Sequence, residues 1–204
     1  MRADARAALQ RLEREAAIWR EEPIKRVAVR NRLIRPLRVR RFAAFGANSF
    51  VDRPTWIYGP QKITVGEGVM FLRGAWLAVE RPAWGADGPV LTIGDGVAAR
   101  FACTISAAES ITVEEHVGMG ANVTIIDSSH TWGPDHPSAL YGPLTTGPIR
   151  VGRGTWLADR AMVAAGTDIG EQCAIAANSV VTGTVPDYSI VVGNPGRVVG
   201  TTRT

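Results

Sequence analysis

The sequence predicts an all-β protein built as a parallel β-helix, and two observations support this prediction. Apolar side chains recur every six residues over most of the 204-residue chain, and glycine or asparagine recurs at a fixed place in the same period. An α-helix repeats every 3.6 residues and a strand every two, so a period of six with a corner residue describes a short strand followed by a tight turn. Three such units form one triangular coil of about 18 residues, and stacked coils bury a continuous apolar column.

The apolar positions fall into five runs with a strict spacing of six. All of them are apolar, although only 46% of the chain is hydrophobic. The runs are Phe45, Val51 and Ile57; Val65, Phe71 and Leu77; Ile93, Ala99 and Ile105; Val113, Met119 and Ile125; and Val151, Leu157, Val163, Ile169, Ile175 and Val181. This pattern places the β-helix within residues 42–204.

The corner positions follow three residues after an apolar position. They hold residue types that tolerate positive φ, namely Asn48, Gly68, Gly74, Gly96, Asn122, Gly154, Gly166 and Asn178. His116 and Thr184 are exceptions in this phase. We expect His116 to be a surface turn residue.

Breaks in the period locate the loops. Val65 to Ile93 spans 28 residues and Val113 to Val151 spans 38, where one coil needs about 18. The first break fits a loop at 81–88. The second is a long excursion at 128–148, which is rich in Gly, Pro and Ser and holds two of the three histidines. Long loops on a rigid scaffold often carry function, so the sequence predicts the chemistry at this break.

The N-terminal segment, residues 1–41, is predicted to be a separate unit. It holds 13 Lys and Arg against 5 acids, whereas residues 42–204 hold 10 against 14, so the charges are +8 and −4. A predicted α-helix carries an apolar stripe and ends at Pro23; the stripe is Leu9, Leu12, Ala16 and Trp19. The basic arm at 25–41 could contact an anionic membrane, remain solvated or pack on a neighbouring subunit. No nucleic-acid motif accompanies the charge.

Composition excludes several other classes of protein. No apolar run approaches the roughly 20 residues of a membrane-spanning helix, and the first residues lack the apolar core of a secretory signal. We therefore expect a cytoplasmic location. Cys103 and Cys173 belong to no CxxC or Cys/His ligand pattern, so we expect buried thiols and no metal site.

The repeat resembles the hexapeptide-repeat acyltransferases, a family that contains maltose, galactoside and xenobiotic O-acetyltransferases and polysaccharide-modifying relatives. The resemblance covers about 45–199 and rests on the segments 113–130 and 147–199, including Trp-Leu-Ala at 156–158 and Gly-Asn-Pro at 193–195. It implies a left-handed β-helix and a homotrimer with sites shared between neighbouring subunits. It also implies transfer of an acetyl group from acetyl-CoA to a hydroxyl of a sugar or glycan.

His130 is the candidate general base. A hydroxyl has a pKa far above neutrality, so its attack on a thioester needs a group that takes the proton, and histidine titrates in a suitable range. The resemblance implies that His130 has this role, by direct attack without an acyl-enzyme. His136, in Asp-His-Pro, is the competing candidate. Asp127 could orient His130, bind substrate or cap the turn.

The resemblance also implies residues on the donor and acceptor sides. Coenzyme A is expected along the late coils, at Ala158, Asp159, Ala177 and Thr182, with Arg197 near the 3′-phosphate.

On the acceptor side, Arg100 stands where galactoside and maltose relatives commonly carry Asn. It could bind an anionic or bulkier acceptor, or simply face solvent. Trp132 and Tyr141 could stack on a sugar or anchor the loop.

There are three alternatives to O-acetyl transfer. The first is N-acetyl transfer to an amino sugar, and the second is a non-catalytic β-helix that serves as a scaffold. The third is a metal-dependent hydratase like the β-helix carbonic anhydrases. That enzyme requires three histidines, one about two coils upstream of a closely spaced pair, and the chain has none near Gly94.

Overall fold

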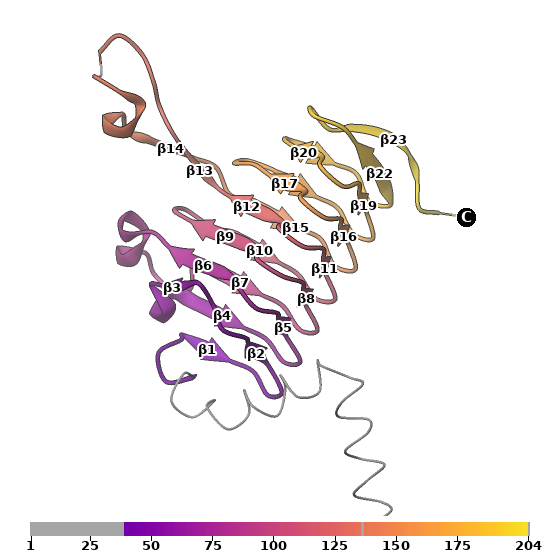
Figure 1. Ribbon diagram of the computed structural model, residues 1–204, viewed down its shortest axis with the longest axis horizontal. Helices are drawn as coiled ribbons and strands as arrows, with labels where there is room; N and C mark the ends of the chain where they lie inside the picture. The colour runs from indigo at the N-terminus through magenta and orange to yellow at the C-terminus, as the bar shows by residue number, and fades with distance from the viewer. Residues whose placement is uncertain (1–38, 136, 204) are drawn as a thin grey trace, which may run out of the picture.

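The computed structural model describes residues 39–135 and 137–203, and these residues form a parallel β-helix (Figure 1). Three parallel sheets run along the stack of coils, and each coil contributes one short strand to each sheet. We call them sheets A, B and C, in the order in which the chain visits them. The prediction of an all-β fold with parallel sheets is confirmed.

The strand bounds show how short each unit is. Sheet A contains β1 (Ala44–Phe45), β4 (Ile63–Val65), β7 (Leu91–Ile93), β10 (Ile111–Val113), β15 (Ile149–Val151), β18 (Asp168–Ile169) and β21 (Thr184–Val185). Sheet B contains β2 (Phe50–Val51), β5 (Met70–Phe71), β8 (Ala98–Ala99), β11 (Gly118–Met119), β16 (Trp156–Leu157), β19 (Ala174–Ile175), β22 (Ser189–Val192) and the antiparallel β23 (Arg197–Thr201). Sheet C contains β3 (Trp56–Tyr58), β6 (Trp76–Val79), β9 (Thr104–Ala107), β12 (Thr124–Ile126), β17 (Met162–Val163) and β20 (Val180–Val181).

We number the coils from the N-terminus. Coil 1 is β1–β3, coil 2 is β4–β6, coil 3 is β7–β9, coil 4 is β10–β12, coil 5 is β15–β17 and coil 6 is β18–β20. The C-terminal strands β21, β22 and β23 follow coil 6.

The predicted apolar positions form the core and lie in register. On sheet C, for example, Ile57 pairs with Leu77, Leu77 with Ile105 and Ile105 with Ile125. Every predicted position is buried except Phe45 and Ile57, which are partly buried and lie in coil 1, the first coil that the described residues form. The hexad period therefore identified core positions correctly, because the residue at each of these positions points inward. Three-residue strands such as β4 and β10 bury a second side chain, Ile63 and Ile111.

The corners follow the predicted phase at most positions, and the positive φ falls one residue earlier at, for example, Arg53 and Gly183. His116 is exposed and has φ 58°, so its assignment as a surface turn residue is confirmed. Gly183 has φ 73° and takes the corner beside Thr184, which begins β21 instead. Ala102 and Arg160 also adopt positive φ although neither is glycine or asparagine. The stacking of the coils therefore imposes this conformation even where the residue type does not favour it.

Both cysteines are buried, as predicted. The Cys103 Sγ lies 3.1 Å from the carbonyl oxygen of Gly120 in the next coil. Burial away from water raises the pKa of Cys103 to about 11 and also raises that of Cys173, because a thiolate is poorly solvated there.

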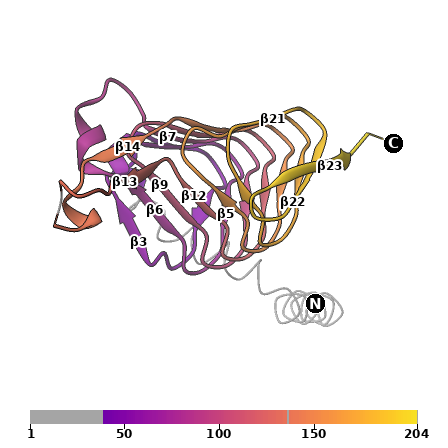
Figure 2. The same ribbon diagram turned by 90° about the horizontal axis from the view of Figure 1, so that it is seen from above.

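Two excursions leave the β-helix at the same edge, where sheet C ends and the chain returns to sheet A (Figures 1 and 2). The first carries the 3-10 helix η2 (Arg81–Gly85) between β6 and β7. The second is a hairpin of β13 (Ser128–His130) and β14 (Leu144–Thr146) with the 3-10 helix η3 (Ala139–Tyr141) between them. A third 3-10 helix, η1 (Pro60–Lys62), follows β3. The excursions that carry η2 and the hairpin match the two loops predicted at 81–88 and 128–148.

Some predictions fall on residues outside the described part of the chain. These are the N-terminal helix, most of the basic arm and His136. Residues 39–135 and 137–203 contain no helix that is long and apolar enough to cross a membrane.

Candidate active site

The hairpin that follows coil 4 is the centre of the candidate site. Its strands pair antiparallel, with Ser128 opposite Thr146 and His130 opposite Leu144. The backbone N–H of Gly147 donates to the Asp127 carbonyl oxygen at 2.9 Å, which closes the root of the hairpin. Two-stranded pairing thus holds His130 at a defined height above the β-helix, rather than on an irregular loop.

The His130 ring is exposed and has one partner among the described residues. Its Nδ1 lies 3.1 Å from the carbonyl oxygen of Gly142. A carbonyl can only accept a hydrogen bond, so Nδ1 carries the proton in the neutral ring and Nε2 keeps its lone pair. The geometry therefore presents Nε2 as the proton acceptor.

Gly142 allows this arrangement because of how closely the two arms of the hairpin approach. A Cβ atom on Gly142 would lie 2.0 Å from the Thr131 carbonyl oxygen. The backbone N–H of Thr131 also donates to the Pro143 carbonyl at 2.9 Å, and its hydroxyl donates to the same oxygen at 3.0 Å. Gly142 was not predictable from the sequence, because nothing in its spacing of twelve residues from His130 indicates this contact.

Asp127 does not contact His130 in the structure, so the predicted pairing of these two residues is not seen. Its buried carboxylate instead accepts three backbone hydrogen bonds from the turn of coil 3: from Ala108 at 2.7 Å, and from Glu109 and Ser110 at 2.9 Å each. Of the alternatives left open by the sequence, capping the turn is the one that the contacts match. Asp127 ties the root of the hairpin to the coil below.

The environment of Asp127 has two opposing effects on its ionisation. Burial is the larger effect and raises the pKa above its ordinary value, while the three backbone hydrogen bonds lower it; the charge of Glu109 raises it further. The net direction is upward. The carboxylate therefore loses favourable solvation by water on burial, and the three backbone hydrogen bonds offset part of this loss.

Most of the other predicted residues lie on two edges of sheet C. We call residues 52–55, 72–75, 100–103, 120–123, 158–161 and 176–179 the B–C edge, and the residues that directly follow the sheet C strands the C–A edge. Arg100, Ala158, Asp159 and Ala177 are on the B–C edge, whereas Thr182 and the His130 hairpin are on the C–A edge. Within a single chain, Arg100 and the three donor-side residues therefore lie on a different edge of sheet C from the hairpin.

Asp159 is exposed but its carboxylate is engaged. Oδ1 accepts a hydrogen bond from the backbone N–H of Ala121 at 2.8 Å, one coil below. Asp95 and Asp187 make the same contact to Glu67 and Glu171, at 2.7 and 2.9 Å. This recurrence indicates that Asp159 connects adjacent coils through its hydrogen bond. The sequence had predicted only a contact between Asp159 and coenzyme A.

The remaining predicted residues are exposed. Arg197 lies in β23, opposite Val192. Trp132 and Tyr141, on the hairpin, are 77% and 70% exposed, so neither side chain anchors the loop. Among the described residues, no group of three or more His, Cys, Asp or Glu could hold a metal ion.

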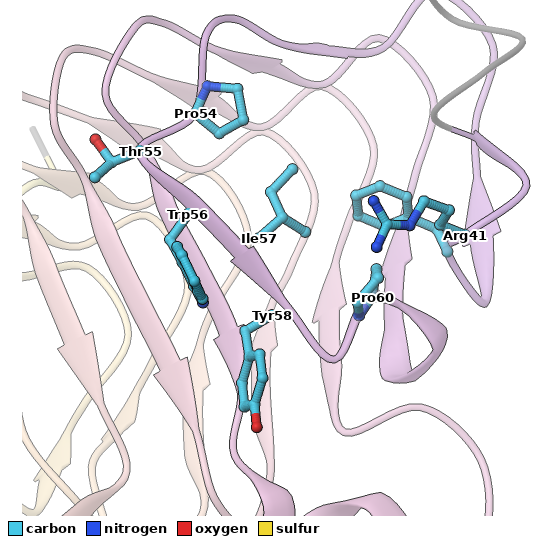
Figure 3. Close-up of a pocket in the computed structure, with 8 residues that line it drawn as sticks. Arg41, Pro54, Thr55, Trp56, Ile57, Tyr58 and Pro60 are labelled. Atoms are coloured by element: carbon cyan, nitrogen blue, oxygen red, sulfur yellow. The ribbon is translucent and has the colours of Figure 1, made fainter.

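A pocket of about 470 Å³ lies at the N-terminal end of the β-helix, away from His130 (Figure 3). Arg41, Trp56, Ile57 and Tyr58 are among the residues that line it. In Figure 3, Trp56 and Tyr58 project from one side of β3 and Ile57 from the other. The hexad pattern identified Ile57 but gave no role to the two aromatic residues.

The chain is similar to several curated acetyltransferases. Galactoside O-acetyltransferase of Escherichia coli strain K12 is 30% identical over 158 residues, which is 78% of this chain and 63% of the relative. A probable acetyltransferase of Mycobacterium tuberculosis is 46% identical over 52 residues, 26% of this chain and 17% of the relative. The chain thus spans less than two thirds of the length of these relatives. No family model matches the chain.

Solved structures share the fold. A mutant of the N-acyltransferase AntD from Bacillus cereus, in complex with dTDP and coenzyme A, matches with a TM-score of 0.68 at 20% identity, covering 83% of this chain and 89% of that one. A galactoside acetyltransferase in complex with coenzyme A matches with a TM-score of 0.56 at 22% identity, covering 79% and 66%. With its stacked hexad coils, the chain shares the fold of these solved acyltransferase structures, and in sequence it is similar to hexapeptide-repeat acetyltransferases such as the galactoside O-acetyltransferase.

Proposed function

We propose that the protein is a coenzyme A-dependent acyltransferase that moves an acetyl group from acetyl-CoA to a hydroxyl of a sugar or glycan. The orientation of His130 is the observation that carries the proposal. Nδ1 donates to the Gly142 carbonyl, and the ring is exposed on a strand. A general base needs a fixed tautomer and an accessible lone pair, and His130 has both.

In the proposed reaction the acceptor oxygen attacks the thioester carbonyl carbon while His130 Nε2 takes the hydroxyl proton. The intermediate then collapses: the carbon–sulfur bond breaks, and the coenzyme A thiolate receives the proton from the imidazolium. A backbone N–H is the proposed donor to the oxyanion. The proposed transfer is direct, and the burial of both cysteines supports it, because neither thiol is accessible to carry the acyl group.

The donor is proposed to approach from the C-terminal side of the hairpin. At the C–A edge, Cβ atoms added to Gly166 or Gly183 would meet nothing within 4 Å, so the backbone beside Thr182 is open. Open backbone suits a pantetheine chain that hydrogen-bonds to main-chain groups. Ala158, Asp159 and Ala177 are proposed as further contacts, and Arg197 as a partner of the 3′-phosphate. The reaction requires no metal.

We propose a homotrimer in which neighbouring subunits share each site. The predicted residues are divided between the two edges of sheet C, and a neighbour could bring the B–C edge of one subunit to the hairpin of the next. Exposed Trp132 and Tyr141 support this proposal, because large exposed apolar side chains often mark contact surfaces. The proposed β-helix is left-handed, as in the resembling family, and residues 42–204 form the acyltransferase domain.

N-acylation of an amino sugar is the second candidate function. AntD, an N-acyltransferase, shares the fold with a higher TM-score than the galactoside acetyltransferase, 0.68 against 0.56. The same His130 would take a proton from the attacking amine. Hydroxyl and amine acceptors therefore belong in one screen.

The test has two parts. Thermal unfolding is measured while acetyl-CoA is titrated, and we expect the melting temperature to rise with ligand concentration; acetyl phosphate is the control. Release of the coenzyme A thiol is then followed with matched acceptors, such as glucose and glucosamine, together with longer glycans. An unchanged melting temperature at saturating acetyl-CoA would contradict the proposal.

A further inference from the structure

We propose that the outer surface of coils 1–3 is a binding platform for an anionic glycan whose successive sugars carry carboxylate groups. The platform consists of three exposed aromatic side chains and three exposed arginines: Trp56, Trp76, Phe101, Arg53, Arg73 and Arg100. The inference rests on the proposed acyltransfer, because it assigns the chemical class of the acceptor.

The aromatic part begins with two stacked tryptophans. Trp56 and Trp76 pair in register on β3 and β6, with ring centroids 6.2 Å apart and ring planes 31° apart. They are 52% and 41% exposed, and Phe101 in the next coil is 44% exposed. Flat rings left open to solvent offer apolar faces on which the C–H faces of sugar rings can stack.

The arginines repeat with the aromatic residues. Arg53-Pro-Thr-Trp56 in coil 1 and Arg73-Gly-Ala-Trp76 in coil 2 have the same spacing, and the Gly74 N–H donates to the Arg53 carbonyl at 3.1 Å, which places the two segments side by side. In coil 3 the position level with Arg73 is held by Phe101, and Arg100 lies one residue before it.

Within the described ranges, none of these three guanidinium groups forms an ion pair. Residues 42–204 carry four more acids than bases, yet in the described part of the chain these three arginines lie without an acidic partner at successive levels of the stack. Guanidinium groups bind carboxylates through two parallel hydrogen bonds.

The repetition favours a polymer over a nucleotide. One arginine and one tryptophan recur at the same positions in coils 1 and 2, coil 3 adds Arg100 and Phe101 beside them, and coils stack at about 4.8 Å. A glycan with an acidic group on successive sugars repeats both features, whereas a nucleotide offers one base and one diphosphate. The geometry therefore matches a repeating ligand.

The platform lies on the acceptor side of His130. It occupies coils 1–3, the hairpin follows coil 4, and the proposed donor residues lie in coils 5 and 6 and, for Arg197, in β23 beyond them. Between Trp76 and the hairpin, the same column of sheet C carries Thr104 and Thr124, small hydroxyl residues that a sugar chain can cross. In a trimer whose symmetry axis runs parallel to the stack, the coils of all subunits lie at the same heights. The platform is therefore also separated along the stack, in the same order, from the His130 of a neighbouring subunit.

Oligosaccharide binding tests the platform independently of catalysis. Tetragalacturonate is titrated against the full chain by calorimetry and tryptophan fluorescence, with neutral maltotetraose as the matched ligand. We expect tetragalacturonate to bind and maltotetraose to bind at least tenfold more weakly. The double variants Trp56→Ala/Trp76→Ala and Arg53→Gln/Arg73→Gln should each weaken binding of tetragalacturonate at least tenfold. Arg203→Gln, at the other end of the stack, is the control for charge and should bind normally.

Several results would overturn the platform. These are no binding of tetragalacturonate by the wild type, equal binding of the neutral ligand, or unchanged binding by both double variants. Dissociation of the oligomer in the tryptophan variant, measured by light scattering, would show a subunit contact instead. UDP-glucose that binds more tightly through the same residues would show a nucleotide site. Retained tetragalacturonate binding without acetyl-CoA stabilisation would contradict only the proposed acyltransfer; His130→Ala should keep the binding in either case.

Discussion

The Nδ1 atom of His130 lies 3.1 Å from the carbonyl oxygen of Gly142, and this contact joins the two arms of the hairpin. The hairpin therefore both carries the candidate base and sets its tautomer. A change that opens the hairpin should lower the rate of catalysis and leave the stability of the β-helix nearly unchanged. The strands of the coils pair with one another and do not depend on the hairpin.

Replacement of His130 by alanine should reduce acyl transfer at least a hundredfold, since general base catalysis typically contributes about that much or more. The ring is exposed, so the melting temperature should stay within a few degrees of the wild type. Initial rates of thiol release and thermal unfolding give the two values. Full activity in this variant would move the role to another group, with His136 the next to replace.

Replacement of Gly142 by alanine should displace the carbonyl that orients His130. The new Cβ would lie 2.0 Å from the Thr131 carbonyl oxygen, so one arm of the hairpin must shift. We expect kcat to fall about tenfold or more with little change in the melting temperature. Gly133→Ala is the matched control in the same hairpin, because a Cβ there meets nothing within 4 Å. Equal rates in the two variants would argue against orientation by Gly142.

Replacement of Asp127 by alanine should destabilise the fold, since it leaves three backbone N–H groups without their acceptor. We expect a loss of about 2 kcal/mol or more in the free energy of unfolding, measured with urea. Asp135→Ala removes an exposed carboxylate from the hairpin and should cost little. A loss of activity by Asp127→Ala without loss of stability would instead favour a direct catalytic role.

The pH dependence of stability should report the raised pKa of Asp127. A carboxyl whose pKa is higher in the folded state binds a proton more readily when folded, so its contribution to stability is present below about pH 3.8 and is lost as pH rises through the folded pKa. The difference in unfolding free energy between wild type and Asp127→Asn should therefore decrease as pH rises over this range. A difference that increases with pH would indicate that the backbone hydrogen bonds outweigh burial.

The two thiols should be unreactive in the folded protein. Cys103 has its pKa raised to about 11 and both side chains are buried, so few thiolates form at pH 8 and reagents reach neither residue. Ellman's reagent should label no protein thiol in native buffer and both after unfolding in guanidinium. Rapid labelling of the native protein would contradict the burial. Because the protein thiols should not react, Ellman's reagent can also be used to measure the coenzyme A thiol that the reaction releases.

The core was predictable residue by residue because parallel stacking forces every coil to repeat the coil below. Phe71 and Met119, for example, lie on the same sheet in register with Ala99 between them, as the period of six requires. The loop at 128–148 was predictable as a break in this period. Its hairpin pairing was not, since one strand of three residues carries too little sequence pattern to identify its partner.

The sequence alone determined the period, hence the β-helix, its core and the place where the chain departs from it, because those features depend on which residue in each strand faces inward. The tertiary structure decided which groups meet: His130 with Gly142, Asp127 with the 108–110 turn, and Trp56 with Trp76. The division of the other candidate residues between two edges of sheet C also appeared only there. Such contacts join residues that lie far apart along the chain, and their distances are set by how coils stack and hairpins close.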